Sequence, residues 1–363
     1  MTEAPSRGAA RHPLAQAAEG RGKGVPRAKI ADGYTISRVI KGGWQLAGGH
    51  GEVSREAAID DMAAYVAAGI DTFDCADIYS GVEDLIGTFL RRTDADVKVH
   101  TKFVPDLDLL PVLDRAHVAR IIDRSRARLG RERLDLVQFH WWDYAIPGWI
   151  EAARLLADLQ RGGKIRLIGG TNFDTAHTRA LLDAGVPLAT MQVQYSLLDD
   201  RPARGLASLC AERGMKLLCY GTVAGGFLSE RWLGKPEPRE PLANRSLTKY
   251  KLIIEDAGGW EWFQALLRAL EGIARRHGTS IAAVAGRIVL DFPEVAAVIV
   301  GVHRGAHLAE HGALCGIPLD ASDRAAIDAV LRQRVPLAGD VYALERDRTG
   351  RHGRIMKYNL GNT

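Results

Sequence analysis

Apolar, strand-like runs alternate with helix-period segments along this chain from about Tyr34 onward. Such alternation indicates a parallel sheet that is covered by helices on its faces. The strand candidates are VIKGGWQL (39–46), DTFDCA (71–76), VKVHTKF (97–103), LDLVQFHW (134–141), IRLIGGTN (165–172), ATMQVQYS (189–196), MKLLCYG (215–221) and AAVIVGV (296–302). Eight strand–helix units predict an α/β fold of the closed (β/α)8 TIM barrel type, and a doubly wound open sheet is the structural alternative.

Helix candidates lie between these strands. They include residues 56–69, 116–130 and 148–163, and Gly69, Gly130 and Gly163 lie where helix C-termini are expected. A long non-periodic stretch from Ser229 to about Gly259 follows the seventh strand. A segment of this length inside a compact domain is usually functional, so we interpret it as a lid over a cofactor or substrate. We also expect extra helices in the C-terminal part of the chain.

The composition is that of an ordinary globular protein, with 363 residues, 47% hydrophobic and 25% charged. No apolar run reaches the roughly 18–20 residues of a membrane helix, and the N-terminus lacks the apolar core of a secretory signal. The four cysteines show neither metal-ligand spacing nor a disulfide framework. We therefore expect a cytoplasmic protein that has no metal site and no membrane association.

The net charge of +4 lies outside the expected barrel. It matches the excess within residues 1–30, where the acidic residues are Glu3 and Glu19 and the basic ones are Arg7, Arg11, Arg21, Lys23, Arg27 and Lys29. Because nucleic-acid binding requires a basic face on the folded domain, we expect no such partner. We predict a disordered basic tail over 1–30, a barrel domain over 31–340 and a C-terminal tail near the substrate opening over 341–363.

Four polar residues at the ends of successive strands point to carbonyl chemistry: Asp74, Tyr79, Lys102 and His140. A lysine ammonium beside a phenol favours the phenolate and makes the phenol a better proton donor. A buried lysine needs a carboxylate to remain charged, and Asp74 is the candidate. A histidine can hydrogen-bond a substrate oxygen. Barrels place catalysis at the C-terminal ends of their strands, so we expect the four side chains to converge on one face.

Taken in order, these segments resemble the aldo-keto reductase family over about residues 34–335. The run DTFDCADIYSGVEDLIG is similar to the family's Asp-x4-Tyr signature, HTKF to its lysine strand and LDLVQFHW to its histidine strand. IGGTNF, MQVQYSLLD and CYGTVAGGFLS resemble further family elements, with Thr171 in place of a serine and Met191 in place of an asparagine. No strand is followed by a G-x-G-x-x-G helix start, which agrees with a cofactor site of this barrel type.

The resemblance implies NAD(P)H-dependent carbonyl reduction, with Tyr79 as general acid, Lys102 and Asp74 easing its proton release and His140 orienting the substrate carbonyl. Thr171, Asn172 and Gln192 would hold the nicotinamide carboxamide, and Tyr220 would stack on its ring. Trp44 and Trp141 match positions that line the substrate pocket, and at most one of Trp141 and Trp142 can face the barrel mouth. The terminal cofactor element reads GVHRGAHLAEH, where Arg304 could bind a 2′-phosphate and Glu310 could contact adenine. NADP is therefore favoured, with NAD as the alternative.

We therefore expect an NADP(H)-dependent oxidoreductase that acts on a small aldehyde, ketone or sugar. A cofactor-binding regulatory subunit without turnover and an NADP-dependent epimerase are the alternatives. The basic residues of the C-terminal tail are Arg346, Arg348, Arg351, Arg354 and Lys357, and they form either a solvated run or a set that draws an anionic substrate toward the site.

Overall fold

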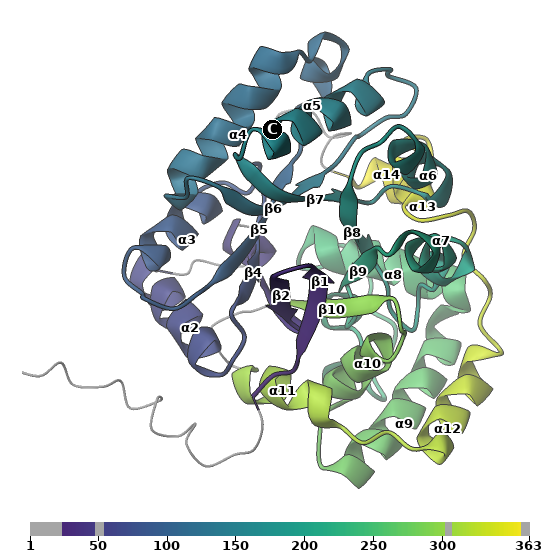
Figure 1. The fold of residues 1–363 in the computed structure, drawn as a ribbon. Helices are drawn as coiled ribbons and strands as arrows, with labels where there is room; N and C mark the ends of the chain where they lie inside the picture. The colour runs from purple at the N-terminus through teal and green to yellow at the C-terminus, as the bar shows by residue number, and fades with distance from the viewer. Residues whose placement is uncertain (1–23, 48–53, 302–306, 357–363) are drawn as a thin grey trace, which may run out of the picture.

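The computed structural model describes residues 24–47, 54–301 and 307–356. Its centre is a closed barrel of eight parallel strands in which the last strand pairs with the first. These strands are β3 (Val39–Gly42), β4 (Thr72–Asp74), β5 (Lys98–Phe103), β6 (Leu134–Phe139), β7 (Ile165–Thr171), β8 (Leu188–Gln194), β9 (Lys216–Tyr220) and β10 (Val295–Gly301). The predicted (β/α)8 barrel is confirmed, and the open sheet is excluded because the barrel is closed (Figure 1).

Helices connect the strands and cover the outside of the barrel (Figure 1). They are α2 (Arg55–Ala67), α3 (Val82–Leu90), α4 (Arg115–Leu129), α5 (Trp149–Arg161), α6 (Thr175–Asp183), α7 (Leu206–Arg213) and α10 (Ile281–Leu290). Gly69, Gly130 and Gly163 follow α2, α4 and α5 with φ of 85°, 64° and 81°. This left-handed conformation, which favours glycine, ends each helix where the sequence predicted an end.

A hairpin that the sequence analysis did not predict lies before the barrel. Its strands β1 (Arg27–Ala31) and β2 (Tyr34–Ser37) are antiparallel. Ile36 belongs to the same buried cluster as Ile40, Leu136 and Leu218 from the barrel strands. The expected tail over 1–30 is therefore too long at its C-terminal end, because β1 already begins at Arg27; residues 1–23 lie outside the described residues.

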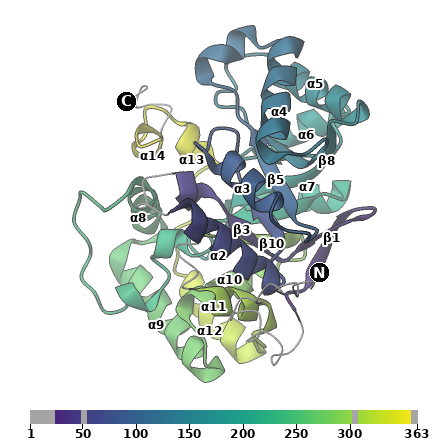
Figure 2. The same cartoon turned by 90° about the vertical axis from the view of Figure 1, so that its left-hand side faces the viewer.

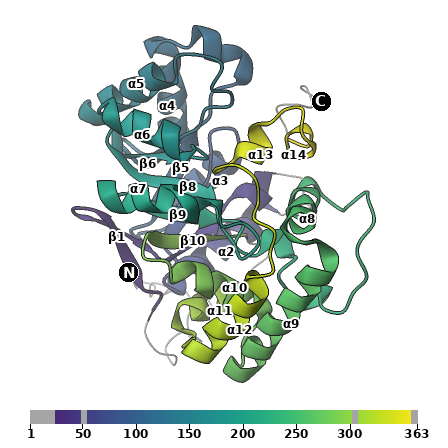
Figure 3. The same cartoon turned by 90° about the vertical axis from the view of Figure 1, so that its right-hand side faces the viewer.

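The segment after β9 is more regular than expected. It contains α8 (Arg245–Ala257), so the prediction of a non-periodic stretch up to Gly259 was wrong in its second half. Asn244 caps α8 by accepting a hydrogen bond from Leu247 N at 3.0 Å. With α9 (Gly259–His277) and α12 (Ala321–Leu331), α8 contributes to a second apolar core beside the barrel, and α9 and α12 lie side by side (Figure 3).

The chain then returns to the barrel. After α11 (Leu308–Ala313) and α12, residues 332–342 lead to two short helices, α13 (Ala343–Arg346) and α14 (Arg351–Arg354), which lie near α8 (Figures 2 and 3). Short 3-10 helices complete the described structure: η1 (Trp44–Ala47), η2 (Leu107–Val112), η3 (Arg201–Arg204), η4 (Ala224–Gly226), η5 (Glu230–Trp232) and η6 (Leu314–Gly316). None of the described helices is both long and apolar enough to cross a membrane.

Candidate active site

The site lies at the C-terminal ends of the barrel strands. Asp74 is the last residue of β4, Lys102 lies near the end of β5, and His140 directly follows β6. In the parallel ladder, Asp74 pairs with His100 and Lys102 pairs with Gln138, so the strands end at neighbouring levels. The three side chains therefore reach the same mouth of the barrel, where active sites of this fold are built.

Asp74 and Lys102 form a buried ion pair. Lys102 Nζ lies 2.6 Å from Asp74 Oδ1, and the two side chains are 7% and 6% exposed for Lys102 and Asp74, respectively. The ammonium also donates to the Cys75 carbonyl at 2.9 Å. Burial alone would lower the pKa of Lys102, but the charge of Asp74 and the hydrogen bond to it raise the pKa above its ordinary value. Lys102 is therefore a stable cation at the base of the site.

A buried amide network holds the other oxygen of Asp74. Oδ2 accepts hydrogen bonds from Gln138 Nε2 at 2.9 Å and from Gln192 Nε2 at 2.6 Å. Gln192 Nε2 also donates to Gln138 Oε1 at 2.9 Å. The sequence analysis missed Gln138, although Gln138 and His140 are two residues apart and the period of a strand places such residues on the same face.

Tyr79 lies on the loop between β4 and α3. The Lys102 ammonium is 5.2 Å from the centroid of its ring, and the ring of Trp44 meets it edge to face at 5.1 Å. Burial raises the pKa of Tyr79 and the charge of Asp74 adds to this, while Lys102 lowers it by charge and hydrogen bonding. The net shift is upward, so the phenol keeps its proton at neutral pH and lies beside a cation that would stabilise the phenolate.

His140 is held as a neutral imidazole. Its Nδ1 lies 3.1 Å from the Thr171 carbonyl oxygen, and the rings of Trp142 and Tyr342 meet it edge to face at 4.5 Å and 5.9 Å. Burial lowers the pKa of His140 to about 3, and the nearby charges of Arg346 and Lys102 act in the same direction. The imidazole is therefore uncharged at any pH at which the protein is expected to work.

The residues expected to hold a nicotinamide lie together at the ends of β7, β8 and β9. Tyr220 OH donates to Asn172 Oδ1 at 2.9 Å, and Asn172 N donates to the Gln192 carbonyl at 2.9 Å. Asn172 adopts φ of 61°, a left-handed conformation that asparagine tolerates better than most residues. Thr171 precedes it and is buried. The structure thus groups Thr171, Asn172, Gln192 and Tyr220.

Arg304 and Glu310 are the two residues expected near the adenosine end of the cofactor. Arg304 lies outside the described residues. Glu310 lies in α11, where its Oε2 is 3.1 Å from His307 Nδ1. Its Oε1 is buried and has no hydrogen-bond partner among the described residues.

The two adjacent tryptophans have different surroundings. Trp141 is fully buried, packs on Phe139 and donates from Nε1 to the Ile146 carbonyl at 3.0 Å. Trp142 contacts His140 instead. Trp142, rather than Trp141, therefore contacts a residue of the candidate site. Trp44 is 41% exposed beside Tyr79.

The C-terminal segment contributes residues that the sequence analysis did not assign. Arg346 Nη1 donates to the carbonyls of Trp141 at 2.5 Å and Trp142 at 2.8 Å, and Nη2 donates to that of Asn172 at 2.9 Å. Its guanidinium lies 3.9 Å from the centroid of the Tyr144 ring. Arg351 pairs with Glu255 of α8 at 2.5 Å. The interpretation of the tail as a solvated basic run was therefore wrong for Arg346, whereas Arg351 is exposed as well as paired.

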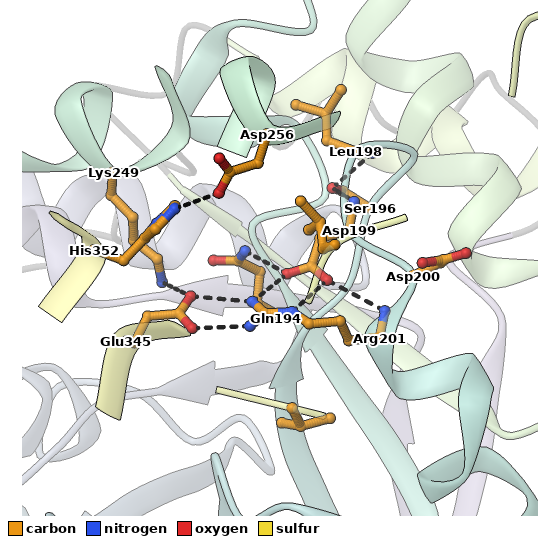
Figure 4. Close-up of polar contacts among 12 residues, drawn as sticks. Gln194, Ser196, Leu198, Asp199, Asp200, Arg201, Lys249, Asp256, Glu345 and His352 are labelled. Carbon is orange, nitrogen blue, oxygen red and sulfur yellow. Dashed lines mark hydrogen bonds and ion pairs between the residues drawn. The ribbon is translucent and has the colours of Figure 1, made fainter. Parts of the chain in front are cut away.

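Buried charges anchor this segment (Figure 4). Glu345 accepts two hydrogen bonds from Arg201 at 3.1 Å and 3.2 Å, and Lys249 of α8 lies 3.6 Å from it. His352 in α14 lies 2.6 Å from Asp256 in α8. The C-terminal segment is thereby tied both to the barrel and to α8.

Comparisons with known proteins agree with this fold. Aldo-keto reductase YhdN of Bacillus subtilis (strain 168) is 25% identical over 316 residues, which cover 84% of this chain and 93% of that protein. Flagellar radial spoke protein 5 of Chlamydomonas reinhardtii is 31% identical over 258 residues, 60% of this chain, and the chain spans about half (49%) of that relative's length. The solved glycerol dehydrogenase AKR11B4 from Gluconobacter oxydans has the same fold, with a TM-score of 0.73 at 24% identity over 86% of this chain and 97% of that chain. The sequence model of the aldo/keto reductase family matches residues 38–332, and the chain belongs to this family.

Proposed function

We propose that this protein interconverts a carbonyl group, in an aldehyde, ketone or sugar, and an alcohol by hydride transfer with NADP(H). The observation that carries the proposal is the buried pair of Asp74 and Lys102 beside Tyr79, which keeps its proton. A protonated phenol next to a fixed cation is suited to give its proton to a carbonyl oxygen while negative charge develops there.

The residues around the mouth fit a nicotinamide dinucleotide. Thr171 and Asn172 present hydroxyl and amide groups for a carboxamide, and Tyr220 presents a ring for stacking. Gln192 donates its amide hydrogens to Asp74 and Gln138, so only its amide oxygen could contact the carboxamide. The buried Oε1 of Glu310, which has no hydrogen-bond partner within residues 24–47, 54–301 and 307–356, would suit an amino group such as that of adenine. When bound, such a cofactor would supply or accept the hydride.

Side chains of the protein carry out and support the proton transfer. Tyr79 holds the proton that moves to the substrate oxygen in reduction and receives it in oxidation. Lys102 stabilises the phenolate left behind, and Asp74 keeps Lys102 charged. The amides of Gln138 and Gln192 hold Asp74 in place and satisfy its second oxygen inside the barrel.

The test has two steps. The purified protein is titrated with NADPH and with NADH to measure binding. Consumption of each nucleotide is then measured from the absorbance of the nicotinamide band in the presence of a panel of carbonyl compounds. We expect tighter binding of NADPH and its consumption. Binding without consumption would favour a regulatory subunit or an epimerase, and no binding of either nucleotide would contradict the proposal.

Tyr79→Phe separates chemistry from binding. It should bind the cofactor as the wild type does and lose about 10²–10⁴-fold in kcat, because general acid catalysis contributes that much. Tyr195→Phe is the matched control, since the Tyr195 ring stacks on Phe292, and it should keep the wild-type kcat. Unchanged turnover in Tyr79→Phe would remove Tyr79 from its role.

A further inference from the structure

The loop that carries Tyr79 is held against the end of β5 at two points. Lys102 Nζ donates to the Cys75 carbonyl at 2.9 Å. Val104 N, which directly follows the strand, donates to the two carboxyl oxygens of Asp77 at 3.3 Å and 3.2 Å. Both contacts come just before Tyr79 in the chain, so they fix how the chain approaches the tyrosine.

Tyr79 is also confined by its own backbone contacts. Its N–H donates to the Ala76 carbonyl at 3.0 Å, in a turn that contains Asp77, and its carbonyl accepts from Val82 N at 3.0 Å. Val82 is the first residue of α3. The position of the phenol therefore depends on the Asp77 contact before it and on α3 after it.

Arg128 of α4 braces the same loop from the outer side of the barrel. Its Nη1 donates to the Asp77 carbonyl oxygen at 3.2 Å and to Glu83 Oε2 at 3.3 Å. Glu83 lies in α3, is 1% exposed, and its Oε1 accepts from Thr101 Oγ1 of β5 at 2.7 Å. A Cβ at Gly87 of α3 would clash with the Arg128 carbonyl oxygen, so only glycine lets the two helices lie this close. The loop is therefore enclosed by β5, α3 and α4.

The Asp77 side chain can make its contact with Val104 N without carrying a charge. Burial raises the pKa of Asp77 to about 8, and the charge of Glu83 acts in the same direction; the hydrogen bond from Val104 N and the charge of Arg124 act against them. At pH 7 the carboxyl group is therefore mostly neutral, and it still accepts from Val104 N. An asparagine would have nearly the same shape and would keep an acceptor oxygen, so it is a matched substitution.

We propose that Asp77 is a positioning residue: it holds the loop of Tyr79 against β5 and so keeps the phenol beside the Lys102 ammonium. Arg128 and Glu83 brace the loop from outside. The inference rests on the proposed proton transfer from Tyr79. The ammonium lies 5.2 Å from the centroid of the Tyr79 ring, and its stabilisation of a phenolate weakens with distance. A shift of the loop would therefore slow the chemical step. The groups expected to hold the nicotinamide lie at the ends of β7, β8 and β9, so cofactor affinity would not change.

Substitutions of Asp77 test the proposal with NADPH and the carbonyl compound of the panel that the wild type reduces fastest. Asp77→Ala removes the acceptor for Val104 N and should lower kcat by about tenfold to a hundredfold, because small displacements of catalytic groups reduce rates by this order. Its affinity for NADPH, measured by titration, should equal that of the wild type. Asp77→Asn should restore most of kcat, because the amide oxygen accepts from Val104 N. Wild-type kcat in Asp77→Ala, or an equal loss in Asp77→Asn, would overturn the proposal.

Tyr79→Phe tells whether Asp77 acts through the tyrosine. If Asp77 only positions the phenol, adding Asp77→Ala to Tyr79→Phe should not reduce the small remaining turnover further, because the proton donor is already absent. A general loosening of the site would instead lower the remaining turnover by the same factor as in the wild type. That additive result would overturn the proposal.

Arg128→Met carries the same test if Asp77→Ala does not fold, because it removes an outer contact at a half-buried position. We expect about a threefold to tenfold loss of kcat with unchanged NADPH affinity, and no further loss when Tyr79→Phe is also present; wild-type kcat would overturn the proposal. Arg120→Met, at an exposed position of α4, is the control and should keep the wild-type kcat. A wild type that turns over no carbonyl compound contradicts the proposed function, whereas wild-type turnover that these variants do not change removes only the inference about Asp77.

Discussion

Arg201 and Glu345 form a bidentate ion pair, and their side chains are 1% and 0% exposed, respectively. Arg201 also pairs with Asp199 at 2.7 Å, and Lys249 lies 3.6 Å from Glu345. Burial would raise the pKa of Glu345, but Arg201 and Lys249 lower it to about 2. This cluster fastens the C-terminal segment to the loop after β8 and to α8 (Figure 4).

Removing Glu345 should destabilise the protein strongly. Glu345→Ala leaves Arg201 buried with half of its partners, and breaking a buried pair in this way typically reduces the free energy of unfolding by about 3–5 kcal/mol. Urea denaturation at pH 7 measures the change. Limited proteolysis should show cleavage near residue 345 in the variant only.

The exposed pair of Arg179 and Glu212 provides the control for this change. Their oxygen and nitrogen atoms lie 3.1 Å apart on the surface, where solvent screens the interaction. Glu212→Ala should therefore leave the unfolding midpoint nearly unchanged. An equal loss in both variants would mean that burial of the Arg201–Glu345 pair is not what stabilises the segment.

Loss of the three hydrogen bonds of Arg346 should affect catalysis more than stability. Arg346→Met removes the bonds to the Trp141, Trp142 and Asn172 carbonyls and should lower kcat/KM by about tenfold to a hundredfold, because small displacements of catalytic groups reduce rates by this order. Arg346→Lys should recover only part of the lost kcat/KM, since an ammonium lacks the planar set of N–H donors of a guanidinium. Arg354→Met, at an exposed position of the same segment, should retain wild-type kinetics. Wild-type kcat/KM in Arg346→Met would show that the strand ends keep their positions without it.

The barrel could be predicted because each of its strands is a short, mostly apolar and buried run. Such runs between helices are typical of a covered parallel sheet. The hairpin before the barrel was missed because β1 carries two charged residues and is mostly exposed or half-buried, although β2 is largely buried. A signal was nevertheless present: Asp32-Gly33 lies between alternating residues, and Gly33 adopts φ of 65° at the turn.

The site was predictable in part for a similar reason. Asp74, Lys102 and His140 stand at strand ends, and the barrel places strand ends together. Arg346 and Glu345 could not be found in this way, because their partners lie more than a hundred residues earlier and the connection depends on how residues 332–342 cross the molecule. Likewise, His140 is held by a contact with the backbone carbonyl of Thr171, which no residue type reveals.

Gln138 offers a test of the amide network below the catalytic pair. Gln138→Leu removes a donor to Asp74 and an acceptor for Gln192 without a large change in volume. We expect about a tenfold loss of kcat with little change in cofactor affinity, because Asp74 and Lys102 would be less firmly oriented. Gln138→Glu should lose more, since a second carboxylate would lie beside Asp74. Equal kcat in the wild type and Gln138→Leu would contradict a positioning role for this amide.

Buried neutral histidines should make the protein less stable in mild acid. His100 lies inside the barrel with Nε2 3.1 Å from Tyr34 OH, and burial lowers its pKa to about 4; Asp74 raises it and Lys102 lowers it further. Between pH 6.5 and 4 the unfolded chain binds a proton at this histidine and the native protein does not, so stability falls as the pH falls. From pH 7 to 5 the loss attributable to His100 is about 2 kcal/mol, since each pKa unit corresponds to about 1.4 kcal/mol. Urea denaturation across this range should show that the free energy of unfolding depends less steeply on pH in His100→Gln than in the wild type. Identical slopes would mean that His100 takes up its proton in the native protein, without unfolding.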